Sequence, residues 1–187
     1  MNYEKLPKYL SQDQVRTLFS KITDKRDYAL FGVIYKYGLR VSEASFLNLE
    51  DIDLERRKIR ITRAKGGISG ERTIFPDLLS KIKTYLLERK DNSPAVFTGK
   101  RGRLKKRMIQ ALFYKYAKEA NLERYSVHSL RHSIAVHLLE DGQGIEFVQD
   151  QLGHKNIKNT LIYSKITSPR REEIYRELEN SRKVVRI

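Results

Sequence analysis

Apolar residues recur at helical spacing over most of the chain, and this pattern predicts a mainly helical protein. The first predicted helix follows Ser11, a residue type that commonly caps helix N-termini, and the second runs over about residues 24–36. Gly38 stands where a left-handed residue ends a helix, and Ser42 is suited to cap a third helix. The first fifty residues therefore predict three consecutive helices.

The pattern changes to alternation in the middle of the chain. Residues 58–63 and 72–75 alternate apolar and polar positions around a Gly-rich connection, which is typical of a β-hairpin. Lys65 lies at the predicted hairpin tip, and residues 52–54 are a candidate third strand. The expected fold class is mainly α with a small antiparallel β-sheet, that is, α+β.

Helical periodicity returns in the second half of the chain. It predicts helices at about residues 78–90, 108–117, 129–140 and 145–152, and another after Asn156 that carries Tyr163. Ser168 and Pro169 resemble the start of a charged tail helix. We find no internal repeat and no clear linker, so residues 1–187 are expected to form one domain, with residues 168–187 as the tail helix.

Charge points to a polyanionic partner. The 187 residues include 38 Lys and Arg against 23 Asp and Glu, which leaves a formal net charge of +15. Nucleic acid is the simplest partner for such a chain, and an anionic membrane surface is the alternative. No stretch approaches the ~20 apolar residues of a membrane-spanning helix, and no signal peptide opens the chain, so we expect a cytoplasmic protein. The absence of cysteine excludes disulfides, thiolate chemistry and cysteine-ligated zinc.

The chemically richest stretch is residues 126–163, which contains all four histidines of the chain: His128, His132, His137 and His154. His128 and Arg131 are three residues apart at the start of a predicted helix, whose free N–H groups favour an anion. A tyrosine, Tyr163, follows within one short helix of His154. These residue types suit a site that binds a phosphate and supplies its own nucleophile.

Other interpretations of these residues remain open at this point. His128 and His132 are spaced for zinc, although the glutamate of the usual catalytic zinc signature is replaced by Ser129. His137 fits a packed or surface histidine. A cluster of six basic residues is either a solvated loop or a phosphate contact; it comprises Lys100, Arg101, Arg103, Lys105, Lys106 and Arg107.

Taken together and in order, the motifs resemble the catalytic domain of the tyrosine recombinases, the lambda-integrase or Xer-like family, over about residues 6–167. The matching segments are YKYGLRVSEASFLNLEDIDL, KIRITRAKGGISGERTIFP, HSLRHSIAVHLLEDG and IEFVQDQLGHKNIKNTLIYSKI. The resemblance implies a set of catalytic residues, with Glu43 in support: Arg40, Lys65, His128, Arg131, His154 and Tyr163. Arg63 is an alternative to Lys65 if the hairpin register slips.

The family resemblance implies a mechanism without metal or cofactor. Tyr163 would attack one DNA strand, leaving a 3′-phosphotyrosine link and a free 5′-hydroxyl, and Lys65 would protonate the departing 5′-oxygen. Arg40 and Arg131 would clamp the phosphate oxygens. His128 would accept or relay the tyrosine proton, and His154 would hydrogen-bond the phosphate.

The same resemblance raises expectations about organisation and partners. The N-terminal core-binding domain of most members is expected to be absent, so the chain is either an excised fragment or a naturally minimal member. The expected partners are double-stranded DNA and further copies of the chain, as a tetramer on nucleoid DNA, with the tail helix docked on a neighbouring subunit or folded back on its own domain. Type IB topoisomerase-like relaxation, non-catalytic DNA binding and zinc-dependent hydrolysis are the alternative functions.

One structural expectation follows from this assignment. The stretch at residues 126–163 supplies only part of the site, because the second arginine and the proton donor lie far away in sequence. We therefore expect the Arg40 turn and the Lys65 hairpin to converge with this stretch on one basic concave face.

Overall fold

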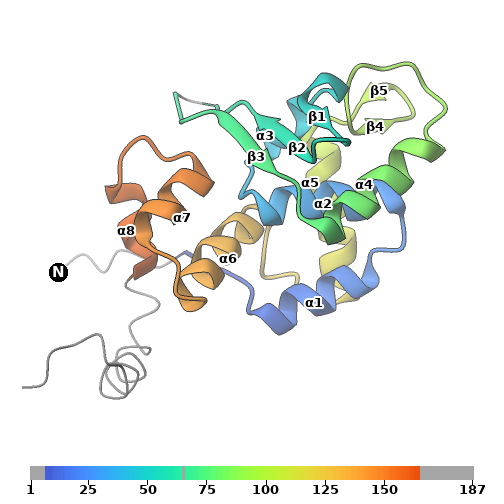
Figure 1. Cartoon of the computed structure of the whole chain (residues 1–187). Coiled ribbons are helices and arrows are strands. Elements are labelled where there is room, and N and C mark those ends of the chain that lie inside the picture. The colour runs from blue at the N-terminus through green and yellow to red at the C-terminus, as the bar shows by residue number, and fades with distance from the viewer. Residues whose placement is uncertain (1–6, 65, 165–187) are drawn as a thin grey trace, which may run out of the picture.

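The computed structural model describes residues 7–64 and 66–164, and the predicted tail helix lies outside these residues. Within them the chain forms helices and two small antiparallel sheets, as the pattern predicts (Figure 1). In chain order the elements are α1 (Gln12–Lys21), α2 (Lys25–Lys36), α3 (Val41–Phe46), the 3-10 helix η1 (Leu49–Asp51), β1 (Ile52–Asp53), β2 (Lys58–Ile61), β3 (Gly70–Thr73), α4 (Pro76–Glu88), β4 (Thr98–Gly99), β5 (Gly102–Arg103), α5 (Lys106–Glu119), α6 (Val127–Glu140), α7 (Ile145–Leu152) and α8 (Lys158–Ser164).

The predicted starts of the first two helices are confirmed by their caps. The Ser11 hydroxyl accepts from the Gln14 backbone N–H at 3.2 Å, and the Gln14 side chain accepts from the Ser11 N–H at 2.9 Å. This reciprocal pair satisfies two backbone donors that the helix leaves free. The Asp24 carboxylate accepts from the Asp27 N–H at 3.0 Å and starts α2 in the same way.

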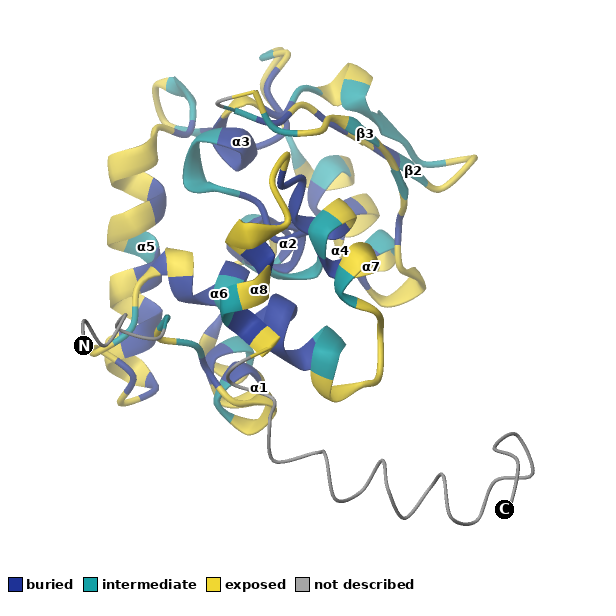
Figure 2. Ribbon diagram, turned by 90° about the vertical axis from the view of Figure 1, so that its left-hand side faces the viewer, coloured by how far each residue is buried: buried dark blue, intermediate teal, exposed yellow. Residues whose placement is uncertain are grey.

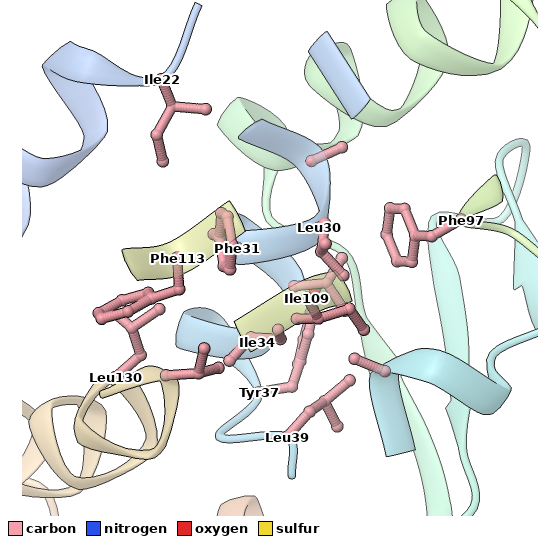
Figure 3. Close-up of a cluster of buried hydrophobic side chains, with 14 of the residues drawn as sticks. Ile22, Leu30, Phe31, Ile34, Tyr37, Leu39, Phe97, Ile109, Phe113 and Leu130 are labelled. Carbon is pink, nitrogen blue, oxygen red and sulfur yellow. The ribbon is translucent and has the colours of Figure 1, made fainter. Parts of the chain in front are cut away.

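Helix α2 is the centre of the main core. Its residues from Ala29 to Ile34 are all buried, and it packs against α4, α6 and α3. Phe31 meets the Phe113 ring of α5 edge-on, with ring centroids 5.8 Å apart (Figure 3). Six consecutive buried residues occupy every face of the helix, so this stretch must be covered on all sides, which is why the other elements surround it.

A second, smaller apolar cluster joins α6, α7 and α8. Its buried members are Ile134, Ala135, Val136, Val148, Leu152 and Tyr163. These three helices lie together on one side of the molecule, and the faces of α6 that meet its neighbours are buried (Figures 1 and 2). Tyr163 is therefore part of a packed core and not a surface side chain.

The predicted hairpin is present, but its second strand is displaced. Strand β2 pairs with β1 and with β3, and Arg60 lies opposite Glu71. The sequence places the second strand at residues 72–75, whereas β3 is Gly70–Thr73. Phe75 instead caps α4 and Pro76 is its first residue, a position that needs no N–H donor. The helix consequently begins two residues before the predicted start.

One further expectation is wrong. Ser42 does not cap α3, because the cap position is Arg40 and the helix starts at Val41. The basic connection after α4 contains a short hairpin, formed by β4 and β5. Gly102, with φ of +86°, lies in the left-handed region at the start of β5. No helix among the described residues is long and apolar enough to cross a membrane.

Replacing Gly38 by alanine should destabilise the fold by about 2–4 kcal/mol. Its φ is +56°, and an added Cβ would lie 2.5 Å from the Leu152 Cδ2 atom, so left-handed strain and a core clash add together. Gly102 is the matched control, because its φ is also positive and no atom lies within 4 Å of the added Cβ. Denaturant unfolding should show a smaller loss, about 1–2 kcal/mol, for Gly102→Ala. Equal losses for the two variants would contradict the packing described for Gly38.

Candidate active site

The site begins at the turn between α2 and α3. Gly38 follows the end of α2 and lies in the left-handed region, and Arg40 is the N-cap of α3. Glu43, three residues later, turns back and accepts the Arg40 backbone N–H at 2.8 Å. A carboxylate in the first turn of a helix is also favoured by the helix dipole. The predicted supporting residue Glu43 thus fixes the turn that carries Arg40.

Glu43 is the point where separate segments meet. Besides the Arg40 backbone, its carboxylate accepts from the Arg40 Nη1 at 2.7 Å, from the Arg63 Nη1 at 2.9 Å and from the Ala64 N–H at 3.1 Å. Burial alone would raise the pKa of Glu43, but the Arg40 N–H, the Arg63 charge and the other donors outweigh it and lower that pKa. Glu43 therefore remains ionised while buried.

Arg63 has a central structural role that the sequence interpretation missed. Its side chain is 1% exposed. The guanidinium also donates to three backbone carbonyls, those of Tyr37 at 2.8 Å, Gly38 at 3.3 Å and Gln151. It connects the Arg40 turn, the end of the β2 segment and the end of α7. With its Nη groups committed in this way, Arg63 is a structural residue and not a substitute for Lys65.

The burial of Arg63 could have been predicted from the alternation of apolar and polar residues over residues 58–63. Ile59, Ile61 and Arg63 occupy successive inward positions, and all three are buried. Extending the period-two pattern by one step would have placed the arginine inside the molecule. A buried arginine needs a carboxylate or several carbonyl partners, which would have directed attention to Glu43.

Arg131 reaches the same turn from α6. It is 2% exposed. Its Nη1 donates to the Gly38 carbonyl, and its Nη2 donates to the Leu152 carbonyl at 2.9 Å and to the His154 Nε2 at 2.8 Å. Burial, with help from the charges of Arg40 and Arg63, lowers the pKa of Arg131 to about 10, so it stays charged at neutral pH. Three of its five N–H donors are used in these contacts.

His154 is held from both ring nitrogens. Since arginine can only donate, the Nε2 that meets Arg131 accepts, and the Nδ1 carries the proton and donates to the Thr160 hydroxyl at 2.9 Å. Burial and the Arg131 charge lower the pKa of His154 to about 4, so the ring is neutral at neutral pH. The predicted residue therefore lies directly against Arg131, joined to α8 through Thr160.

His128 and Arg40 line a common groove with a volume of about 480 Å³. His128 lies in the first turn of α6 and is exposed to solvent. Partial burial of its ring, followed by the charges of Arg131 and Arg40, lowers its pKa. The opposite wall of the groove is formed by α5 through Lys106, Gln110 and Tyr114. The groove thus leads from two predicted site residues towards the basic start of α5.

Tyr163 completes the group from α8. It is 2% exposed, and its hydroxyl lies 2.7 Å from the His132 Nδ1. Burial raises the pKa of Tyr163 to about 12, against the opposing effect of Arg131 and Arg40. Sequence reasoning treated His132 only as a zinc ligand, although its position four residues after His128 places both on one helix face. Their rings meet edge-on, with centroids 4.6 Å apart.

The charges explain what this site can bind. Three arginines converge on it and one carboxylate pairs with two of them, Arg40 and Arg63, so three positive charges and one negative charge leave a net +2 with neutral histidines. The three charges are close, because Arg40 and Arg63 share the Glu43 carboxylate and Arg63 and Arg131 share the Gly38 carbonyl. Such a site favours an oxyanion, and planar guanidinium groups suit phosphate oxygens.

The structure describes all of the predicted basic cluster but not the predicted lysine of the hairpin tip. Lys65 lies outside the described residues, but the backbone N–H of Ala64, which precedes it, donates to Glu43.

In the basic cluster, Arg103 differs from the other five residues. Its guanidinium donates to the Ser45 carbonyl at 2.8 Å and the Asn48 side chain at 2.6 Å, so it fixes β5 to the end of α3. The other five are exposed: Lys100, Arg101, Lys105, Lys106 and Arg107.

The remaining histidine is a packing residue, as one of the sequence interpretations has it. His137 is 5% exposed and its Nδ1 lies 2.8 Å from the Tyr35 hydroxyl. For the zinc interpretation, the His132 Nδ1 is already bound to Tyr163. Among residues 7–64 and 66–164, no group of three or more histidine or carboxylate side chains is arranged to hold a metal ion.

The chain is similar to known proteins over most of its length. The model of the phage integrase family matches residues 8–169. The tyrosine recombinase XerA of Pyrococcus horikoshii is 39% identical over 167 residues, which cover 87% of this chain and 58% of the relative. The tyrosine recombinase XerC of Natranaerobius thermophilus is 35% identical over 187 residues, covering 91% of this chain and 62% of the relative. The chain thus spans about three-fifths of the length of these relatives.

Solved structures agree with the fold. A crystal structure of XerA recombinase superposes with a TM-score of 0.81 at 27% identity, covering 92% of this chain and 65% of the other. The XerH site-specific recombinase bound to palindromic difH substrate, a post-cleavage complex, superposes with a TM-score of 0.77 at 26% identity. That match covers 94% of this chain and 54% of XerH.

Replacing Glu43 by glutamine should cost about 3–5 kcal/mol of the free energy of unfolding, because it leaves the buried Arg63 without its counter-charge. Glu71→Gln is the matched control, since its ion pair with Lys58, at 3.7 Å, is solvent-exposed and should contribute at most about 1 kcal/mol. Denaturant unfolding of both variants at neutral pH tests this. A Glu43→Gln protein as stable as the control would contradict the role of the shared carboxylate.

The fold should lose stability as the pH falls from about 6.5 to about 4. His132 and His154 have pKa values lowered to about 4, so the unfolded chain takes up protons in this window that the folded chain does not. His154→Gln keeps an acceptor for Arg131 and removes one titrating group. It should lose about 2–3 kcal/mol less than the wild type across this window, measured by denaturant unfolding at several pH values. Parallel pH profiles for the two proteins would show that His154 is protonated normally in the fold.

Proposed function

This chain belongs to the phage integrase family, and on that premise we propose that it is a site-specific DNA recombinase that cuts and rejoins strands through a 3′-phosphotyrosine intermediate. The observation that carries the proposal is the convergence of Arg40, Arg131 and His154 on one cationic site next to a buried tyrosine. We also propose that the chain forms a single catalytic domain.

The arginines would bind the scissile phosphate. Arg131 keeps two N–H donors beyond those given to Gly38, Leu152 and His154, and Arg40 donates one of its five side-chain N–H groups, to Glu43. The remaining donors can meet the two non-bridging oxygens, where negative charge collects in the transition state. His154 is linked to Arg131 at 2.8 Å and would hydrogen-bond the same phosphate.

Tyr163 would act as the nucleophile. Its oxygen forms the new bond to phosphorus, the bond from phosphorus to the 5′-oxygen breaks, and the 5′-oxygen takes a proton from Lys65. The tyrosine proton passes to the histidine side of the site, where His128 accepts or relays it. The phosphotyrosine bond retains the energy of the phosphodiester, so religation by a 5′-hydroxyl needs neither ATP nor a metal ion.

Double-stranded DNA is the proposed partner, in the nucleoid, with several copies of the chain assembled as a tetramer for strand exchange. The groove beside Arg40 and His128 is bordered by Lys106, and the exposed basic side chains before and at the start of α5 would contact phosphates on either side of the cut. The crystallised XerH relative is itself described as bound to its difH substrate.

Covalent trapping tests the reaction. The wild-type protein should form a denaturant-resistant adduct with members of a pool of nicked duplexes whose sequences flanking the nick are randomised, because the nick lets the cut strand diffuse away and prevents religation. Tyr163→Phe lacks the nucleophilic oxygen and should form no detectable adduct. Gel electrophoresis under denaturing conditions separates adduct from free protein, and sequencing of the trapped DNA identifies the preferred site.

Tyr114→Phe is the matched control. Tyr114 borders the same groove and is 57% exposed, so the substitution removes a tyrosine hydroxyl near the site without touching the proposed nucleophile. It should retain adduct formation. The proposal is wrong if the wild type forms no adduct with any member of the pool, or if the Tyr163→Phe protein still forms one.

A further inference from the structure

The hydroxyl of Tyr163 has one close polar partner among the described residues, the His132 imidazole. The distance between the Tyr163 oxygen and the His132 Nδ1 is 2.7 Å, and the two rings are tilted by 48° with centroids 5.7 Å apart. The tyrosine ring belongs to the buried apolar cluster that also contains Val148 and Leu152 of α7. Packing fixes where the ring lies, and this hydrogen bond decides where the hydroxyl hydrogen points.

The direction of this hydrogen bond follows from protonation. Burial, the neighbouring His128 and the Arg131 charge lower the pKa of His132 to about 4, and burial raises the pKa of Tyr163 to about 12. Both groups are therefore neutral at neutral pH. The tyrosine O–H donates, the Nδ1 of His132 accepts, and the Nε2 carries the imidazole proton.

The position of His132 on α6 places this acceptor beside the phosphate site. His132 directly follows Arg131 in the chain, and its ring meets the exposed ring of His128 edge-on. His128 in turn borders the groove with Arg40. The contact between His132 and Tyr163 is thereby separated from this groove by one ring, that of His128.

We propose that His132 is a positioning residue for the nucleophile, and that it acts by accepting the Tyr163 hydroxyl hydrogen bond at Nδ1 to hold the oxygen at the edge of the phosphate site. The inference rests on the proposed function, since it assigns a role only if Tyr163 attacks phosphorus. The role is positioning because the hydrogen bond needs only an acceptor at Nδ1, and in the proposed reaction it is His128 that accepts or relays the tyrosine proton.

The geometry distinguishes two conservative replacements. In asparagine, the side-chain amide oxygen is attached to Cγ, as Nδ1 is in histidine, so the His132→Asn side chain can accept the same hydrogen bond. In glutamine the amide oxygen lies one bond further out, closer to the position of Nε2. Neither amide can take up a proton at neutral pH, so retention of activity in His132→Asn would require only an acceptor.

The experiment uses the duplex recovered by trapping with the wild-type protein and measures the first-order rate of adduct formation at saturating protein. We expect His132→Asn to react within about threefold of the wild type, and His132→Ala and His132→Gln about 10- to 100-fold more slowly, because a misplaced nucleophile loses rate without losing substrate. Noncovalent affinity for the same duplex, measured in the Tyr163→Phe background, should be unchanged by each His132 variant.

Several outcomes would overturn the inference. An Ala variant that reacts at the wild-type rate or faster would show that the contact is not needed or holds the tyrosine back. An Asn variant as slow as the Ala variant would show that proton uptake is required, and a Gln variant as fast as Asn would exclude the Nδ1 geometry.

Thermal unfolding checks that each variant folds. If the Ala variant does not fold, the comparison of the Asn and Gln variants still decides whether the Nδ1 acceptor is needed. Adduct formation by the wild type and its loss in Tyr163→Phe test the proposed function separately. A failure of the proposed function can therefore be distinguished from a failure of the role inferred for His132.

Discussion

The interaction on which the site depends is the buried ion pair between Glu43 and Arg63. One carboxylate binds the backbone and side chain of Arg40, the guanidinium of Arg63 and the N–H of Ala64. Through Arg63 it is also connected to the carbonyls of the α2–α3 turn and to Gln151 at the end of α7. Three segments distant in sequence are thereby held at one point, and burial of both charges makes any looser arrangement costly.

The Glu43–Arg63 ion pair also determines the electrostatics of the site. Glu43 neutralises only part of the positive charge that Arg40, Arg63 and Arg131 bring together, so the folded protein holds a surplus of cationic charge in a partly buried place. Both Nη groups of Arg63 are engaged in structural contacts, whereas Arg40 and Arg131 keep further N–H donors, and Arg40 lines the groove. A phosphate between these two arginines would relieve the repulsion that helps to lower the pKa of Arg131.

Much of the fold could be predicted from the sequence because local signals agreed with it. Ser11 and Gly38 mark helix ends in the structure as they do in the sequence. The convergence of the Arg40 turn with the residues of α6–α8 was expected from the motif order, and the Gly38 carbonyl contact of Arg131 realises it. What the sequence could not provide were partners from other segments. The roles of Arg63 and His132 appear only when Gln151 and Tyr163 are brought against them.

The most direct test of the account is a crystal structure of the Tyr163→Phe protein bound to a nicked duplex recovered by trapping. The phosphate at the cleavage position should lie within hydrogen-bond distance of both Arg40 and Arg131, beside His154, with the Glu43–Arg63 pair unchanged. A phosphate bound elsewhere on the protein, with Arg131 still contacting only carbonyls and His154, would contradict it.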